Sequence, residues 1–287
     1  MDEWLQTLVK LGLMGSMLGL KLAQALDITL DDLLFARKEP WQLARSLVII
    51  DVFVPIAILL VILAIRPPRA TEIGLAIIAA APAAPLVLTT AVQAGGRLSY
   101  IASLQLTLAL LAVITTPITL AVLAHVLDFR AAVSPAAVAQ QVVLALVLPT
   151  MVAMLIRARY PRVADRLHPP LRKIAGALFL AVIVLIAVRE APRLVEFDLR
   201  SYVAMMLAVA AALATGQLLG PARPGDRSAL AVECAVRNPG LAMLIAALNF
   251  PLTAALHVLI PYLFVSGIPV ALYVRWRNSA KVAEGGS

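Results

Sequence analysis

The stretch ALAVECAVRNPGLAMLIAALNF, residues 229–250, is apolar for most of its length. A helix of about 20 residues crosses the roughly 30 Å hydrocarbon core of a bilayer, so this stretch is long enough to span one. Its middle holds Asn238-Pro239-Gly240. Proline removes a backbone donor and clashes with the preceding turn. The stretch therefore predicts a membrane helix that is interrupted near its midpoint.

A second segment, 71–94, carries Pro82-Ala83-Ala84-Pro85 in its middle. One such break fits either a packed kink or a discontinuous helix whose free backbone binds an ion or a substrate. Breaks in corresponding positions of two halves point to a transporter binding site. Each broken segment is the second to last of its half if the chain divides into a first repeat, 1–128, and a second repeat, 134–278. The first repeat is then one helix short of five.

The composition extends this prediction to the whole chain, of which 62% is hydrophobic and 14% charged. These values exclude an ordinary soluble enzyme and a disordered chain. We expect an all-α polytopic membrane protein, a single transmembrane domain over 1–287 with a short tail at 279–287. The nine predicted spans are 4–26, 43–65, 71–94, 98–127, 135–156, 171–188, 202–219, 229–250 and 252–274.

The chain has a net charge of +8. Membrane proteins collect Lys and Arg in their cytoplasmic loops, so this charge does not indicate a nucleic acid partner. Lys and Arg concentrate in alternate loops, which predicts an outside N-terminus and an inside C-terminus in a bacterial-type inner membrane. The loops predicted inside hold Arg37, Lys38, Arg45, Arg97, Arg157, Arg159, Arg162, Arg166, Arg172, Lys173, Arg223, Arg227, Arg275, Arg277 and Lys281; those predicted outside hold Arg66, Arg69, Arg130, Arg189, Arg193 and Arg200.

Three ionisable residues within predicted spans are functional candidates, because charges inside a membrane are costly. Glu233 and Arg237 lie four residues apart beside the second break, and Asp51 lies in the second span. The first two share a helix face and form either a self-neutralising pair or part of a site. Together the three carry one net negative charge. If they meet in space, they leave room for one small cation or one proton.

Hydroxyl side chains give a weaker signal. Ser103 and Thr107 share a face of the fourth span, and Thr89 and Thr90 follow the first break. They serve either as hydrogen-bonding contacts between helices or as ligands. The sequence has no metal-ligand spacing, no phosphate loop and no hydrolase motif, so we expect neither an enzyme nor a resident cofactor.

At these breaks the sequence resembles the bile acid:sodium symporter family. The segment 233–242, ECAVRNPGLA, is similar to that family's signature. Further similarities are Gly19-Leu-Lys-Leu22, the segments 28–33 and 37–40, Ala81-Pro82 and Thr115-Thr116-Pro117. The resemblance implies inverted five-helix repeats arranged as a core and a panel, with the two discontinuous helices crossing in the core. Nine helices fit members that lack the first of ten.

The resemblance also implies uptake of organic anions by alternating access, driven in many members by sodium. It places a shared sodium ligand at Glu233 and a substrate or cation contact at Asn238. Half-helix N-termini at the breaks would face the substrate's anionic group. The implied substrate-binding residues are Asn238, Pro239, Gly240, Pro82, Pro85, Thr89, Thr90, Ser103 and Thr107; those implied for the coupling cation, Na⁺ or H⁺, are Glu233, Asp51, Arg237 and Asn238.

Two departures from the family concern sodium. Arg237 stands where members with two sodium sites carry Gln, and Asp51 falls near a family Gln that serves the same site. We hypothesise that an Asp51–Arg237 ion pair replaces the second sodium, or that Arg237 binds the substrate carboxylate. Where the family has Gly-Gly-Thr-x-Ser-Asn after the first break, residues 83–88 of this chain read AAPLVL. The family's hydroxyl and amide ligands for sodium are therefore missing there, and the candidates to replace them are Thr89, Thr90, Ser103 and Thr107.

We therefore expect a secondary transporter of a small organic anion. The alternatives are an auxin-efflux-like or arsenite-type carrier, and a non-transporting membrane receptor or enzyme. The arsenite-type carrier is disfavoured because Cys234 is the sole thiol. The sequence does not specify the oligomeric state.

Overall fold

The computed structural model describes residues 3–28, 35–85, 87–129, 134–194, 198–249 and 252–285. In these ranges the chain forms helices and no β-strand, which confirms the predicted all-α class. The elements are α1 (Glu3–Asp27), α3 (Pro40–Val48), η1 (Ile49–Phe53), α4 (Val54–Ile65), α5 (Arg69–Ala80), α6 (Val87–Gln93), α7 (Leu98–Val126), α8 (Pro135–Val142), η2 (Val143–Val147), α9 (Leu148–Arg159), α10 (Pro161–Leu194), α11 (Leu199–Leu219), α12 (Pro224–Ala235), α13 (Pro239–Asn249), α14 (Leu252–Val265) and α15 (Gly267–Gly285). The elements η1 and η2 are single π-helical turns within longer helices.

Six helices of the described chain are long and apolar enough to cross a membrane. They are Pro40–Ile65, Leu98–Val126, Pro135–Arg159, Pro161–Arg189, Leu199–Leu219 and Val258–Ser279. The remaining predicted spans correspond to α1 and to the interrupted pairs α5–α6 and α12–α13, so the count of nine stays a prediction. The surface agrees with a lipid environment, since large apolar side chains such as Leu155 (71% exposed) and Leu218 (79% exposed) point outward.

Two helices extend beyond the predicted spans. The predicted sixth span, 171–188, lies inside α10, which begins at Pro161, two residues after α9 ends at Arg159. The basic residues between 157 and 173 lie on α9 and α10 and not in a loop. A helix that extends beyond the bilayer can carry charged side chains. The predicted ninth span, 252–274, covers α14 and the first part of α15, which meet at Ser266, and α15 continues to Gly285.

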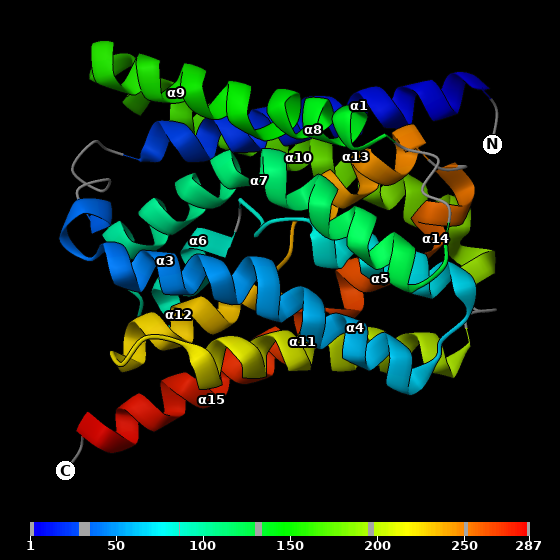
Figure 1. Cartoon of the computed structure of the whole chain (residues 1–287). Helices are drawn as coiled ribbons and strands as arrows, with labels where there is room; N and C mark the ends of the chain where they lie inside the picture. The colour runs from blue at the N-terminus through cyan, green and yellow to red at the C-terminus, as the bar shows by residue number, and fades with distance from the viewer. Residues whose placement is uncertain are drawn as a thin grey trace.

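The helices form two groups, which we name by their elements. The panel consists of α1, α8, η2, α9 and α10, in which α1 packs along both α10 and α9. The core consists of the other helices, in which α11 packs against α4 and α12, and α5 against α7 and α14. Figure 1 shows α1 and α9 at the top of the view and α11 and α15 at the bottom. The two groups meet where α1 contacts α13 and α10 contacts α14.

The two chain ends lie at opposite ends of the helical bundle (Figure 1). The end that holds the C-terminus also holds the starts of α3 and α12. The other end holds the N-terminus and the turn between α4 and α5. This arrangement is the one expected for an odd number of membrane crossings.

Candidate functional site

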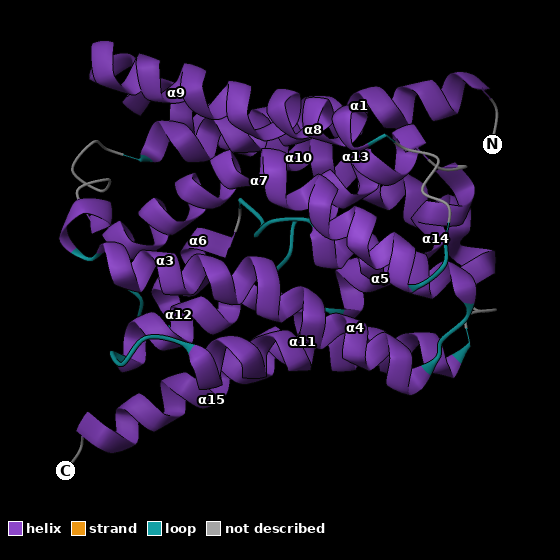
Figure 2. Cartoon of the chain, in the orientation of Figure 1, coloured by secondary structure: helices purple, strands orange, loops and turns teal. Residues whose placement is uncertain are grey.

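The two breaks meet in the middle of the core. Figure 2 shows the two short loop segments that interrupt α5–α6 and α12–α13 running together at the centre of the bundle. The Ala84 amide donates to the Val236 carbonyl at 2.9 Å, and the Asn238 amide donates to the Pro82 carbonyl at 2.7 Å. Residues Ala83 and Arg237 thereby form an isolated antiparallel bridge. The interrupted helices therefore cross, and each break satisfies backbone groups of the other.

Local sequence explains where each half-helix begins and ends. Pro82 cannot donate a backbone hydrogen bond, so α5 ends at Ala80. Pro239 takes the first position of α13, where a missing amide hydrogen costs nothing. The Asn238 side chain caps that helix, because its Oδ1 accepts the Leu241 amide at 3.0 Å. Asn238 is thus used to build the crossing, and its Nδ2 has no hydrogen-bond partner among the described residues.

Arg237 is 2% exposed and binds two backbone carbonyls that the helices leave free. Its Nη1 donates to Ile50 O at 3.2 Å and its Nη2 to Ala79 O at 2.7 Å. In the π turn η1 the Val54 amide bonds Ile49 O, and Pro55 has no amide hydrogen, so Ile50 O is left without a helical partner. Ala79 O lies in the last turn of α5, where carbonyls are also unpaired.

The guanidinium of Arg237 therefore satisfies one carbonyl of η1 and one carbonyl of the last turn of α5. The expected ion pair with Asp51 is not found among the described contacts with N···O within 4.0 Å. Asp51 is the residue after Ile50, whose carbonyl Arg237 binds.

Glu233 lies at the crossing, on α12, with 0% exposure. Its Oε1 accepts a hydrogen bond from Gln105 Nε2 of α7 at 2.8 Å, and the same nitrogen lies 3.4 Å from Ala84 O of the first break. Glu233 Oε2 and Gln105 Oε1 are buried without a hydrogen-bond partner among the described residues. This carboxylate is the most completely buried acid beside the crossing, and burying it alone would be costly.

Panel helix α1 carries a buried basic residue. Lys21 of α1 is 5% exposed. The Lys21 Nζ donates to Gln24 Oε1 at 2.8 Å. Helix α1 approaches the second break closely, because a Cβ on Gly240 would lie only 1.8 Å from the Met17 sulfur. Lys21 follows Met17 by about one helical turn and so brings a positive charge to this interface.

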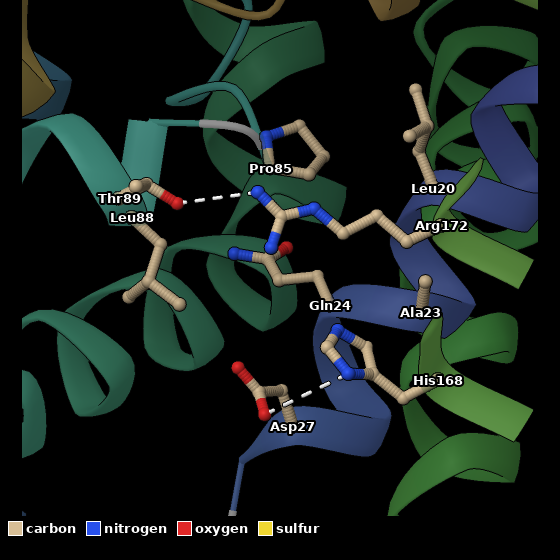
Figure 3. Close-up of a pocket in the computed structure, with 9 residues that line it drawn as sticks. All are labelled: Leu20, Ala23, Gln24, Asp27, Pro85, Leu88, Thr89, His168 and Arg172. Carbon is tan, nitrogen blue, oxygen red and sulfur yellow. Dashed lines mark hydrogen bonds and ion pairs between the residues drawn. The ribbon is translucent and has the colours of Figure 1, made fainter. Parts of the chain in front are cut away.

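A small cleft of about 30 Å³, which has room for a water or two, separates panel from core next to the first break. Its lining residues are Leu20, Ala23, Gln24 and Asp27 of α1, Pro85, Leu88 and Thr89 from the core, and His168 and Arg172 of α10. Figure 3 shows Arg172 reaching across to Thr89, with Gln24 and His168 below it. Arg172 Nη2 donates to Thr89 Oγ1 at 3.3 Å, and His168 Nδ1 lies 4.0 Å from Asp27 Oδ1. Buried Gln24 lines the cleft, and its Nε2 has no hydrogen-bond partner in the described chain.

The other predicted site residues are dispersed. Ser103 is buried on α7, and its carbonyl accepts the Thr107 hydroxyl at 2.8 Å, so Thr107 bonds within its own helix. Thr90 lines a different hollow, with Gln93 and residues of α15. Pro85 and Thr89 line the cleft, whereas Pro82, Asn238, Pro239 and Gly240 belong to the crossing.

Arg97, Asp226 and Glu39 form a cluster of ion pairs, which we call the charged clamp. It holds α12 in place at the end of the bundle where the C-terminus lies. Arg97 Nη2 binds Asp226 Oδ2 at 2.6 Å, and its Nη1 binds Glu39 Oε1 at 2.7 Å. Asp226 is fully buried in the first turn of α12, while Glu39 is partly exposed before α3. The hydrogen bond from Arg97 lowers the pKa of Glu39, and both acids raise the pKa of Arg97. The clamp holds the α12 helix that carries Glu233.

Sequence reasoning missed Lys21, Gln24 and Gln105 as parts of the site. Lys21 lies within a predicted span, so the cost of an intramembrane charge could have identified it as readily as it identified Asp51. The meeting of Gln24 and Arg172 across the cleft could not be read from the sequence, because they lie on different helices. Among the described residues, no group of three or more His, Cys, Asp or Glu side chains could hold a metal ion.

Comparison with known proteins gives one family. The profile of the sodium bile acid symporter family matches residues 14–197, more than half of the chain. The match includes α5, the first break and all of α10, and it ends before the second break. No curated protein matches the chain. With this match, with membrane-spanning helices and with two crossing interrupted helices, the chain belongs to the sodium bile acid symporter family.

Proposed function

We propose that the protein is a secondary active transporter that moves a small organic anion by alternating access, coupled to a cation, Na⁺ or H⁺. The observation that carries the proposal is the crossing of two interrupted helices directly beside a cleft between panel and core. Binding sites of transporters form at such breaks, where irregular backbone and half-helix ends face a cavity.

The chemistry of the cleft favours an anion. Arg172 and His168 can offer positive or donating groups, and the buried Gln24 offers an N–H pair with no partner in the described chain. Asp27 is the one acid in the lining, and it lies beside His168. The apolar part of the lining consists of Leu20, Leu88 and Pro85. A ligand with one carboxylate or sulfonate and a small apolar body matches the chemistry of this lining.

The cleft also joins the two groups of helices. The Arg172–Thr89 hydrogen bond links panel helix α10 to core helix α6. An anion that takes the Arg172 guanidinium from the Thr89 hydroxyl would loosen this link and favour movement of panel against core. We place the protein in a bacterial-type inner membrane with its N-terminus outside and its C-terminus inside, on the distribution of Lys and Arg.

The test is a thermal-stability screen of small carboxylates and sulfonates, with and without Na⁺ and at several pH values, followed by uptake into proteoliposomes. A bound anion should raise the midpoint of unfolding, since a ligand at 100 times its Kd stabilises by about 2.7 kcal/mol. Arg172→Gln should weaken binding about tenfold through loss of one charge-assisted hydrogen bond.

Arg166→Gln is the matched control, because Arg166 is exposed on the same helix and lies outside the cleft lining. Equal loss of binding in both variants would mean that the anion does not bind in this cleft. If no anion of these classes stabilises the protein or enters proteoliposomes, the transport proposal is wrong.

A further inference from the structure

A groove of about 370 Å³ opens on the outer face of the core, between α3, η1 and the last residue of α11. Its volume falls in the range of about 300–1,000 Å³ that is usual for small-ligand sites. The lining is apolar apart from one arginine, and it includes Trp41, Arg45, Val48, Phe53 and Leu219. All of the described lining residues belong to the core and none lies at the breaks, so the transport mechanism proposed above does not use this groove.

The π turn η1 gives the groove its wall. In a regular α-helix, side chains three or four residues apart share a face, so Trp41, Arg45 and Val48 would be followed by residue 52. A π turn inserts one extra residue, and Phe53 lines the groove in its place. On its inner side the same turn offers a backbone carbonyl to the crossing. The groove and the crossing therefore share one structural element.

The groove lies where two membrane-spanning helices end. The span Pro40–Ile65 begins one residue before Trp41, and the span Leu199–Leu219 ends at a lining residue. Trp41 is 80% exposed, and Val48 and Phe53 are exposed as well. Tryptophan is enriched at the boundary between lipid and water, because its ring is apolar and its N–H is polar. The groove therefore faces lipid, with its Trp41 end at the membrane surface.

Arg45 is the one charged side chain among the described lining residues. It is exposed, and its guanidinium has no hydrogen bond and no ion pair within the part of the chain that the structure describes. The acids at the start of α3 are Glu39 and Asp226, and both are already paired with Arg97. A guanidinium binds phosphate through two N–H groups, and a basic pocket between membrane helices is typical of anionic lipid sites. The charge of Arg45 is therefore available to a phosphate headgroup.

We propose that this groove binds one anionic glycerophospholipid. Its phosphate contacts Arg45, its glycerol and ester groups lie beside Trp41, and one acyl chain runs over Val48 and Phe53 toward the middle of the membrane. A zwitterionic lipid binds less tightly, because its own ammonium competes with the guanidinium for the phosphate. The bound chain supports η1 from the outside, while Arg237 holds the same turn from the inside. The proposal does not depend on the transport function.

The test measures how strongly lipids bind beside Trp41, which is one of three tryptophans in the chain. Trp4→Phe and Trp276→Phe together leave Trp41 as the single tryptophan reporter in the full-length protein. This parent variant is placed in phosphatidylcholine vesicles that contain increasing amounts of brominated phosphatidylglycerol or brominated phosphatidylcholine, since bromine quenches tryptophan fluorescence at contact distance. The association constant from quenching should be about fivefold higher for phosphatidylglycerol, which corresponds to the roughly 1 kcal/mol that one arginine contributes near an anionic surface.

In the parent variant, Arg45→Gln should reduce the ratio of the two association constants to about one, and Arg45→Lys should keep most of it because the charge remains. Arg223→Gln is the matched control and should leave the ratio unchanged, because Arg223 is exposed at the same end of the bundle and lies outside the lining. A ratio of about one in the parent variant would overturn the proposal without any change to Arg45. Equal loss in the two Gln variants would overturn it as well, since the preference would then follow the charge of the whole surface.

A second measurement separates the lipid from a free phosphate compound. Soluble glycerol phosphate in excess should leave the quenching ratio unchanged, because it has no chain to occupy the apolar part of the groove. If glycerol phosphate instead displaces phosphatidylglycerol from the parent variant, the site recognises a free phosphate compound and the assignment of a lipid is wrong.

Discussion

Arg97→Ala should destabilise the protein strongly, because it leaves the Asp226 carboxylate buried without its ion partner. Asp226 is 0% exposed and loses two charge-assisted hydrogen bonds, from Arg97 Nε at 3.0 Å and Nη2 at 2.6 Å. It keeps two weaker donors, the backbone amide of residue 97 at 3.1 Å and Gln42 Nε2 at 3.2 Å. Breaking a buried pair costs about 3–5 kcal/mol, and the remaining donors place this case near 3 kcal/mol.

The measurement is the midpoint of thermal unfolding in detergent or nanodiscs. At about 2–4 °C for each kcal/mol, the variant should unfold roughly 6–12 °C below the wild type. Adding Asp226→Asn should restore part of the loss, because the buried charge is then removed. Arg157→Ala is the control, since its partner Asp165 is 66% exposed and such a surface pair contributes about 0–1 kcal/mol. Equal shifts for both Arg variants, or no recovery in the double variant, would refute the reasoning from a buried carboxylate.

Gly216→Ala should lower the free energy of unfolding by about 1–3 kcal/mol in the same assay, because the added Cβ would lie 2.5 Å from the Ala231 backbone. Gly176→Ala is the control: a Cβ there would meet no atom within 4 Å, so this variant should be neutral or slightly stabilising. A Gly216→Ala variant as stable as the wild type would contradict the close approach of α11 and α12. Acidification should also destabilise the protein through Glu39, whose pKa Arg97 holds below the ordinary value of 4.5. The contribution of Glu39 is complete above that ordinary value and is lost as pH falls through the lowered one, so Glu39→Gln should flatten the stability profile below about pH 5; an unchanged profile would rule out this source.

The part of the fold that follows the linear sequence was predictable. Apolar runs locate the spans because every backbone polar group in lipid must be satisfied within a helix. Prolines locate the breaks as well, since Pro82 cannot continue α5 and Pro239 is suited to the first position of a new helix. The boundary of α10 was not predictable from apolar runs, because a helix that extends beyond the bilayer has no reason to be apolar there.

The pairings in the site depend on which helices become neighbours, and a single sequence does not contain that information. The sequence suggested that Arg237 pairs with Asp51 or binds the substrate, but its hydrogen bonds go to the carbonyls of Ile50 and Ala79. Backbone carbonyls are the same in every residue, so no side-chain pattern marks them. Only the π turn that frees Ile50 O has a local sequence signal, which is Pro55. Proline has no amide hydrogen, so Pro55 cannot bond the Ile50 carbonyl.

The hydrogen bonds between the two breaks have a consequence for the synthesis of the protein. They join residues 82–84 to residues 236–238, which lie more than half of the chain length apart. The first break therefore enters the membrane before its hydrogen-bonding partners have been made. Until the ribosome has produced the second break, the Ala84 amide and the Pro82 carbonyl lack the groups that satisfy them in the finished protein. Truncation anywhere before residue 236 should consequently leave a first half that is retained poorly in the bilayer, and co-expression of the missing second half as a separate chain should rescue it.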